Sequence, residues 1–344
     1  MKTPFPISPE ELTTDWLSLV LDCQVDAFSV KPLGEGVGIL GLVTRVTLEG
    51  EACPKTLIAK FQSPVADNRA VAGLYQMYER EITFYTEIAP TLSIRAPSCF
   101  HAGYDPASRA FVLLLEDLDQ YEIGDQVAGC SIEQCEQVVK ALAKFHAETF
   151  KTTAFPSIER HNNEAQVTGM QAGFSAGWPV VKTLFPELIS EQAGRLAPRL
   201  PDYLPALLDA ITADPICISH GDMRLDNIFF GSDHIALVDF QAVSKSAPEH
   251  DLAYFLTQSP SDAVRNAKDW VALYHAELTK LGVDYPLEDC RRRFTQCALY
   301  FLCYAVVICS ALDLANERGR ALGETLLGNS LRSIDALDAF DLLT

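Results

Sequence analysis

The sequence contains no pair of cysteines separated by two residues, although ten cysteines are scattered along its 344 residues. Structural zinc and iron–sulfur sites commonly place their cysteines in such pairs, so the sequence gives no support for either kind of site. A chain of this length also does not need disulfides to hold a small core together. We therefore interpret the cysteines as small buried hydrophobic residues of a protein in a reducing compartment.

A hydrophobic run long enough to cross a bilayer is also missing. The longest run, from Cys297 to Leu312, has sixteen residues and is interrupted only by Ser310. A transmembrane helix needs about 20 apolar residues, so this run predicts a buried helix. The N-terminal residues include early prolines and acidic residues but no apolar segment of the kind that signal peptides carry. We expect a cytoplasmic protein that has no membrane partner.

Basic residues are scarce. The chain has 27 lysines and arginines against 46 aspartates and glutamates, which gives a net charge of −19 at pH 7. Such a charge repels phosphate backbones and anionic lipids, so we expect no nucleic-acid partner. The content of 48% hydrophobic and 21% charged residues is that of an ordinary globular protein, and the length suits two domains or one two-lobed unit.

The distribution of hydrophobic residues predicts an α+β fold in which strands come first and helices later. Strand-like segments cover residues 42–48, 56–61 and 110–115, and a helical pattern covers 67–88. Residues 151–200 are irregular. We therefore predict a small β-rich part followed by a larger, mainly α-helical part. The helical patterns of this second part lie at residues 131–150, 202–212, 261–281 and 287–316.

The polar residues that could carry chemistry are concentrated in residues 217–241. Two short apolar segments flank a turn at residues 231–233 and predict a β-hairpin. Asp222 and Asn227 lie at or before the start of the first strand and Asp239 ends the second, so a hairpin would bring the three to one end. Their oxygen atoms are ligands that Mg²⁺ prefers and shares with phosphates. Two could hold metal while the third accepts a proton from a hydroxyl, as phosphoryl transfer requires.

This segment resembles the catalytic loop of a known group of enzymes. His220-Gly221-Asp222 followed by Asn227 is similar to the H-G-D-x-x-x-x-N motif of the aminoglycoside phosphotransferase, choline kinase and ecdysteroid kinase-like families, whose fold is related to that of protein kinases. The resemblance implies that Asp222 is the catalytic base, that Asn227 and Asp239 hold the metal, and that His220 supports the loop.

The same resemblance implies a domain organisation, cofactors and a partner. We expect a nucleotide-binding lobe over residues 1–116 and a catalytic and substrate-binding helical lobe over 117–344. ATP and Mg²⁺ would be the cofactors, and a small molecule that bears a hydroxyl group would be the acceptor. Gly221 stands where protein kinases have arginine, and Gln241 stands where they have glycine, so metabolite kinases match better than protein kinases.

A glycine cluster near the N-terminus contains Gly34, Gly36 and Gly38, and Gly41 completes a G-x-G-x-x-G pattern. A dinucleotide-binding fold needs a helix directly after this pattern, whereas the following residues are strand-like. The strand, glycine loop and strand that cover nucleotide phosphates in kinases fit better. A plain glycine-rich hairpin is the alternative interpretation.

Lys60 lies within an apolar strand-like run and resembles the family's phosphate-binding lysine. A buried lysine needs a partner, and the helix that follows offers Glu79, Glu81 and Glu87. Glu81 falls on the apolar face of this helix and Glu79 falls outside it. We therefore predict that Glu81 pairs with Lys60 in a closed, nucleotide-bound state. An outward-pointing edge lysine is the alternative.

Residues 111–120 resemble the family's interlobe linker, where backbone groups of Glu116 and Leu118 would bind adenine. Asp251 matches a family aspartate that supports the backbone of the catalytic loop, and a helix N-cap is its other interpretation. His146 lies near the apolar face of a predicted helix, and we interpret it as a satisfied core histidine.

Three functions compete. The leading hypothesis is a kinase that phosphorylates a small molecule. A catalytically silent, kinase-like nucleotide-binding protein is disfavoured because every motif position is present. A metal-dependent phosphoesterase would leave the glycine cluster and Lys60 without a role. The sequence does not decide the identity of the acceptor. The negative charge favours a cation, whereas the aromatic residues within 155–203 favour an apolar molecule.

Overall fold

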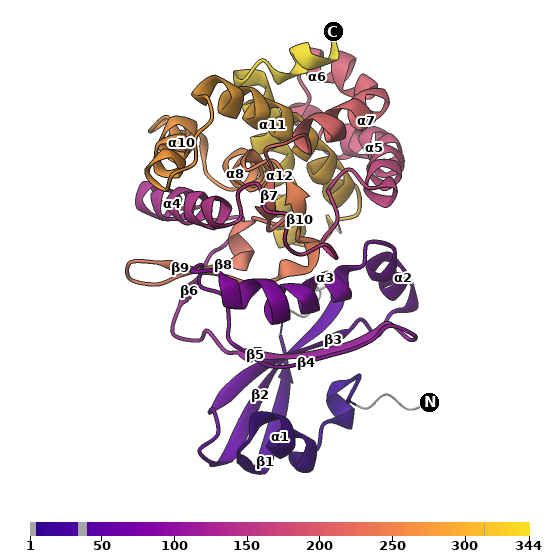
Figure 1. Ribbon diagram of the computed structural model, residues 1–344. Coiled ribbons are helices and arrows are strands. Elements are labelled where there is room, and N and C mark those ends of the chain that lie inside the picture. The colour runs from indigo at the N-terminus through magenta and orange to yellow at the C-terminus, as the bar shows by residue number, and fades with distance from the viewer. Residues whose placement is uncertain (1–4, 34–39, 313) are drawn as a thin grey trace. The chain divides into compact units, whose positions relative to one another are not determined.

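The computed structural model describes residues 5–33, 40–312 and 314–344. Backbone contacts divide the chain into two compact units, and Figure 1 shows the elements of each. The sequence pattern did not predict that a short segment from the C-terminal half packs with the first unit. The first unit is Met1–Tyr121 with Val238–Ala242, and the second is Glu122–Leu237 with Val243–Thr344.

A five-stranded antiparallel sheet forms the centre of the first unit. Its strand order is β1-β2-β3-β5-β4. The three strands predicted from apolar segments are confirmed as β2, β3 and β5, the inner strands of the sheet. The edge strands β1 and β4 were not predicted, because they bury few residues and so carry little apolar signal. The strands are β1 (Gln24–Pro32), β2 (Gly41–Glu51), β3 (Thr56–Gln62), β4 (Cys99–Asp105) and β5 (Ala110–Glu116).

Strand β3 has two buried faces, and Lys60 lies on the one that faces away from the apolar core. Ala59 and Phe61 point into the apolar core of the first unit, where both are fully buried. Lys60 lies between them and therefore points to the opposite face, because successive side chains of a strand alternate. That face is covered by helix α3 (Met77–Thr83), which Figure 1 shows crossing the sheet.

The prediction of one continuous helix over residues 67–88 is wrong, because the structure contains two helices there. Helix α2 (Ala66–Leu74) and helix α3 are separated at Tyr75 and Gln76, and Gln76 has a φ of 53°, outside the helical region. After α3 the chain continues as one π-helical turn, Phe84–Ile88. The first unit also contains helix α1 (Thr14–Leu21), which packs against β1.

The second unit is mainly helical, as predicted. The irregular region contains two helices that the pattern did not indicate, α5 and α6, and the helix expected over 261–281 is divided into α9 and α10. The helices are α4 (Ile132–Glu148), α5 (Glu164–Leu184), α6 (Glu191–Leu196), α7 (Leu200–Ile211), α8 (Glu249–Gln258), α9 (Asp262–Arg265), α10 (Trp270–Lys280), α11 (Leu287–Ser310) and α12 (Glu317–Ala336).

Helix α11 forms much of the core of this unit, where it contacts α5, α7, α8 and α12. By length and composition alone it could cross a membrane, but 72% of its apolar window is buried inside the protein. This burial is the behaviour predicted for a core helix. The predicted extension to residue 316 is wrong, since α11 ends at Ser310.

Short strands flank the motif residues of the second unit. β7 (Cys217–Ser219) pairs with β10 (Ser244–Ser246). β8 (Ile228–Phe230) and β9 (Ile235–Leu237) form the predicted hairpin, and β6 (Glu122–Ile123) pairs with β8.

Candidate active site

The loop between β7 and β8 carries the predicted catalytic residues. Strand β7 is completely buried and ends at Ser219, directly before His220. Gly221 has a φ of 84°, a conformation that glycine adopts without the steric cost of a side chain. The chain then forms a short 3₁₀ turn, Leu225–Asn227, and enters β8. Backbone geometry therefore explains why glycine follows the histidine in this motif.

Asp222 and Asn227 lie together, as their spacing predicted. The side-chain amide nitrogen of Asn227 donates to Oδ2 of Asp222 at 2.9 Å and to the backbone carbonyl of Asp222 at 2.9 Å. The hydroxyl of Tyr254 donates to the other carboxylate oxygen, Oδ1, at 2.8 Å. The guanidinium of Arg224 lies 3.7 Å from Oδ2. Sequence reasoning missed Tyr254, because no local pattern links α8 to this loop.

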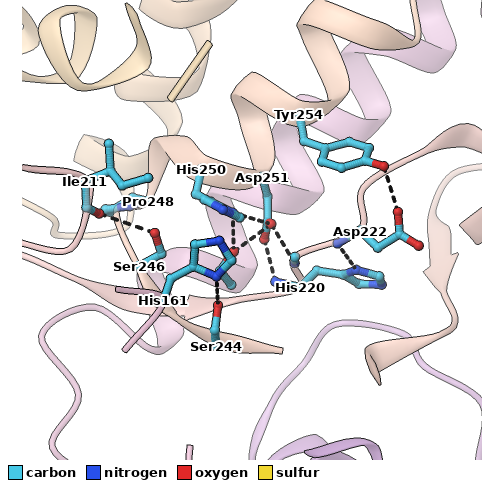
Figure 2. A network of polar contacts seen from close by, with 12 residues as sticks. His161, Ile211, His220, Asp222, Ser244, Ser246, Pro248, His250, Asp251 and Tyr254 are labelled. Carbon is cyan, nitrogen blue, oxygen red and sulfur yellow. Dashed lines mark hydrogen bonds and ion pairs between the residues drawn. The ribbon is translucent and has the colours of Figure 1, made fainter. Parts of the chain in front are cut away.

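Asp251 supports the backbone of the loop, as the family resemblance implied. Its carboxylate accepts hydrogen bonds from the backbone N–H groups of His220 at 2.6 Å and Gly221 at 2.9 Å, and from the hydroxyl of Ser219 at 2.7 Å (Figure 2). It lies inside the first turn of α8 rather than at its N-cap, which is Pro248. The Nδ1 atom of His220 in turn accepts the N–H of Asp222 at 3.2 Å. The loop is therefore fixed from its buried side.

Two buried histidines complete the surroundings of Asp251. Nε2 of His146 lies 3.0 Å and Nδ1 of His250 lies 3.4 Å from its carboxylate oxygens. His146 also contacts the hydroxyl of Tyr274, which confirms it as a satisfied core histidine. Burial alone would raise the pKa of Asp251, but the hydrogen bonds from His146 and His250 lower that pKa well below its usual value. The carboxylate is therefore held ionised in the protein interior.

We expect Asp251→Asn to destabilise the protein by about 3–5 kcal/mol, because breaking a buried charged network leaves its remaining members without a partner. The pKa of Asp251 is lower in the folded state than in the unfolded state. Its contribution to the free energy of unfolding is therefore fully present above about pH 4, the ordinary aspartate value, and is lost as the pH falls through the folded-state pKa. Urea unfolding of wild type and variant at neutral and acid pH measures both effects. An equal difference at every pH would contradict the assignment.

The first unit contains a second cluster of charged side chains, in which Lys60 contacts two acids. Its Nζ lies 2.5 Å from Oε1 of Glu81 and 2.9 Å from Oδ1 of Asp239. Lys60 and Glu81 are both buried. Glu79 is exposed, and its carboxylate contacts the hydroxyl of Tyr104 instead. The structure thus contains the predicted ion pair, and it adds Asp239 as a partner that the sequence did not indicate.

Burial and neighbouring charges shift the pKa values of Lys60 and Glu81 in opposite directions. Burial alone would lower the pKa of Lys60, but the charges of Asp239 and Glu81 raise it above its usual value. Burial raises the pKa of Glu81, and the charge of Lys60 opposes that shift. The lysine is therefore protonated, and its charge favours the ionised form of Glu81 against the effect of burial.

The segment that carries Asp239 is locked into the first unit. Phe240 stacks on Phe84 with 3.4 Å between ring centroids and 9° between planes, and Gln241 hydrogen-bonds to Glu81. Asp239 itself has a φ of 68°, which is unfavourable for a residue other than glycine and is typical of functional sites. Aromatic packing around Phe240 stabilises this strained backbone.

The remaining nucleotide-site predictions stay predictions. The N–H of Glu116 donates to the carbonyl of Ser98 at 2.9 Å, and its side chain forms an ion pair with Arg95. Leu118 is buried, and its carbonyl accepts the N–H of Tyr121 at 3.0 Å. The glycines that we expected over the phosphates, Gly34, Gly36 and Gly38, lie outside the described residues. The strands on either side of them, β1 and β2, form the antiparallel pair that the kinase arrangement needs.

Asn227 and Asp239 have the chemistry that Mg²⁺ requires. Both side-chain hydrogen bonds from Asn227 to Asp222 use the amide nitrogen, so the amide oxygen is the atom that a cation would bind. Asp239 adds an anionic oxygen, the preferred ligand of a hard cation. Within residues 5–33, 40–312 and 314–344, no three or more His, Cys, Asp or Glu side chains are grouped as in a metal site.

A comparison with models of protein families identifies the family to which the chain belongs. Residues 36–282 match the model of the ecdysteroid kinase-like family, which is well over half of the sequence. The chain belongs to the ecdysteroid kinase-like family. A comparison with curated proteins found no match.

Solved structures show that this member of the family has a kinase-like fold. The choline kinase of Cryptosporidium parvum is 12% identical over 92% of this chain and 89% of its own, with a TM-score of 0.56. The GDP complex of a mutant aminoglycoside 2'-phosphotransferase-IIIa is 15% identical over 95% and 96%, with a TM-score of 0.52. The ethanolamine kinase of Plasmodium vivax is 14% identical over 90% and 84%, with a TM-score of 0.50.

Proposed function

We propose that this ecdysteroid kinase-like protein transfers the γ-phosphate of ATP to a hydroxyl group of a small molecule, with Mg²⁺ as cofactor. The observation that carries the proposal is the arrangement of the loop around Asp222, whose carboxylate is oriented by Tyr254 and Asn227. A carboxylate held in one orientation on a rigid loop is suited to accept a proton from a substrate hydroxyl. The similar solved structures support the proposal, because they are choline, ethanolamine and aminoglycoside kinases.

In the proposed reaction, the acceptor oxygen forms a bond to the γ-phosphorus while the bond from that phosphorus to the β,γ-bridging oxygen breaks. ADP leaves with the electron pair, and the proton of the acceptor hydroxyl passes to Asp222. Lys60 binds the phosphates, and Glu81 holds its ammonium group in place. Because little covalent chemistry is left to the protein, the residues act mainly by positioning groups and stabilising charge.

Two residues would hold the metal. These are Asp239, through its carboxylate, and Asn227, through its amide oxygen. The ion, when bound, would neutralise charge that develops on the transferred phosphate. The Lys60 ammonium already neutralises part of the Asp239 charge in the described structure.

Turnover of ATP against a panel of acceptors tests the proposed function. The full chain would be assayed for ADP release with Mg²⁺ and with aminoglycosides, choline-like amines, sugars, amino-acid alcohols and steroids, and mass spectrometry would identify the phosphorylated product. We expect ADP and product to form in equal amounts, to stop on chelation of the metal and to resume when Mg²⁺ is returned.

The same assay distinguishes the alternatives. ATP binding without ADP release in the presence of any acceptor would favour a catalytically silent nucleotide-binding protein. Hydrolysis of phosphate esters in the absence of ATP would favour a phosphoesterase. Either result would contradict the proposed kinase.

A further inference from the structure

Tyr254 is a buried tyrosine whose only hydrogen-bond donor is directed at the proposed catalytic base. Its side chain is 1% exposed, and its hydroxyl lies 2.8 Å from Oδ1 of Asp222 (Figure 2). The ring packs edge-on against Phe301 at 4.6 Å and Tyr304 at 5.9 Å between centroids. This packing leaves the ring little freedom, so the position of the hydroxyl is set by the core of the second unit.

The hydroxyl is a permanent donor. Burial raises the pKa of Tyr254 well above its usual value, and the negative charge of Asp222 raises it further. A tyrosine that keeps its proton at all ordinary pH values has one O–H to donate. That O–H therefore remains available to the carboxylate.

Helix α8 contacts both the backbone and a side chain of the loop. Asp251 binds the backbone N–H groups of the loop, and Tyr254, three residues later on the same face of the helix, binds the side chain of Asp222. On the other carboxylate oxygen, Asn227 donates from the loop itself. Helix α8 thus fixes the loop backbone before Asp222 through Asp251 and one carboxylate oxygen of Asp222 through Tyr254. Asn227 contacts both the other carboxylate oxygen and the backbone carbonyl of Asp222.

We propose that Tyr254 is a positioning residue for phosphoryl transfer, which sets the rotation of the Asp222 carboxylate. The terminal torsion of an aspartate is soft, so an unsupported carboxylate samples a broad range of orientations. Donors on Oδ1 and Oδ2 take one lone pair of each oxygen and leave the others for the acceptor proton. This inference rests on the proposed role of Asp222 as the base.

Tyr254→Phe removes the hydroxyl and keeps the ring. We expect kcat to fall about 10- to 100-fold, because a small misplacement of a reacting group has effects of this size. The KM for ATP should stay near its wild-type value, since the Tyr254 hydroxyl donates to Asp222, which takes the acceptor proton in the proposed mechanism and does not bind the nucleotide. Melting curves of the variant report whether the packing of the ring survives.

Tyr300→Phe is the matched control. Tyr300 is also fully buried on a helix of the same unit, and its hydroxyl accepts a hydrogen bond from Gln166 at 2.7 Å and lies 2.7 Å from Nε2 of His161. It does not touch Asp222. We expect this variant to melt at a lower temperature while its kcat stays near that of the wild type.

A double-mutant cycle with Asp222→Asn separates positioning from general stabilisation. If Tyr254 acts through the base, Tyr254→Phe should change the residual rate of the Asp222→Asn protein very little. Multiplicative losses, or an active wild type with an equally active Tyr254→Phe variant, would overturn the inference alone. A wild type that transfers phosphate to no acceptor would overturn the proposed function together with it.

Discussion

Replacement of Asp222 by asparagine is expected to lower turnover at least ~100-fold, the usual scale for loss of a positioned base. Asparagine has nearly the same size, and its amide oxygen still accepts a hydrogen bond from Tyr254, but its amide nitrogen cannot accept the one from Asn227, and the side chain cannot take the proton of the acceptor. We therefore expect the fold and the binding of Mg·ATP to be retained. Steady-state kinetics on the acceptor found in the panel measure kcat, and calorimetry measures the affinity for Mg·ATP.

Asp233→Asn provides the control for this experiment. Asp233 lies on the turn between β8 and β9 with 85% of its side chain exposed, and its carboxylate contacts its two neighbours in sequence, Ser232 and His234. The same chemical change there should leave kcat near the wild-type value. Wild-type turnover by Asp222→Asn would show that Asp222 is not the base. If Asp222→Asn lost both Mg·ATP binding and turnover, Asp222 would instead be assigned to the nucleotide site.

The parts of the fold that bury continuous apolar surface could be predicted from sequence. Strands β2, β3 and β5 form the middle of the sheet and carry the apolar segments that local patterns detect. The edge strands β1 and β4 face solvent on much of their surface, so they lack that signal.

Helix α5 was missed for a different reason. It contains several glycines and Pro179, residues that normally indicate a break in a helix. Gly173 and Gly177 lie against Val307 and Ser310 of α11, and an added Cβ at either position would approach those side chains within 3 Å. Close packing of two helices therefore requires the glycines, and tertiary contact overrides the local preference.

The contacts of the candidate site are also of two kinds, those that a local sequence pattern predicts and those that join distant segments. The spacing of Asp222 and Asn227, and the position of Glu81 on the apolar face of its helix, are local patterns, and the contacts they predicted are present. The contacts of Tyr254 with Asp222 and of Lys60 with Asp239 join segments distant in sequence. No periodicity indicates such contacts, because they depend on how the helices and strands pack.

Lys60→Ala and Glu81→Ala are each expected to lower kcat/KM by roughly 100-fold, the scale for removal of one preorganised charged donor from a reaction centre. Lys60 binds the phosphates in the proposed mechanism, whereas Glu81 acts through Lys60 by holding its ammonium group. Without Lys60, burial favours the protonated form of Glu81, so the glutamate has no remaining function. The double variant should therefore be little worse than either single one, which is the behaviour of residues that act as a unit.

Glu79→Ala is the matched control for the glutamate, because Glu79 lies on the same helix but is exposed and contacts Tyr104 rather than Lys60. It should retain wild-type kcat/KM. The wild type and the four variants would be compared on one acceptor at fixed Mg²⁺, with melting curves to confirm that each is folded. Independent, multiplicative losses in the double variant would show that Glu81 acts separately from Lys60. A loss in Glu79→Ala as large as that in Glu81→Ala would show that the helix tolerates no change, and the specific role of the ion pair would then be wrong.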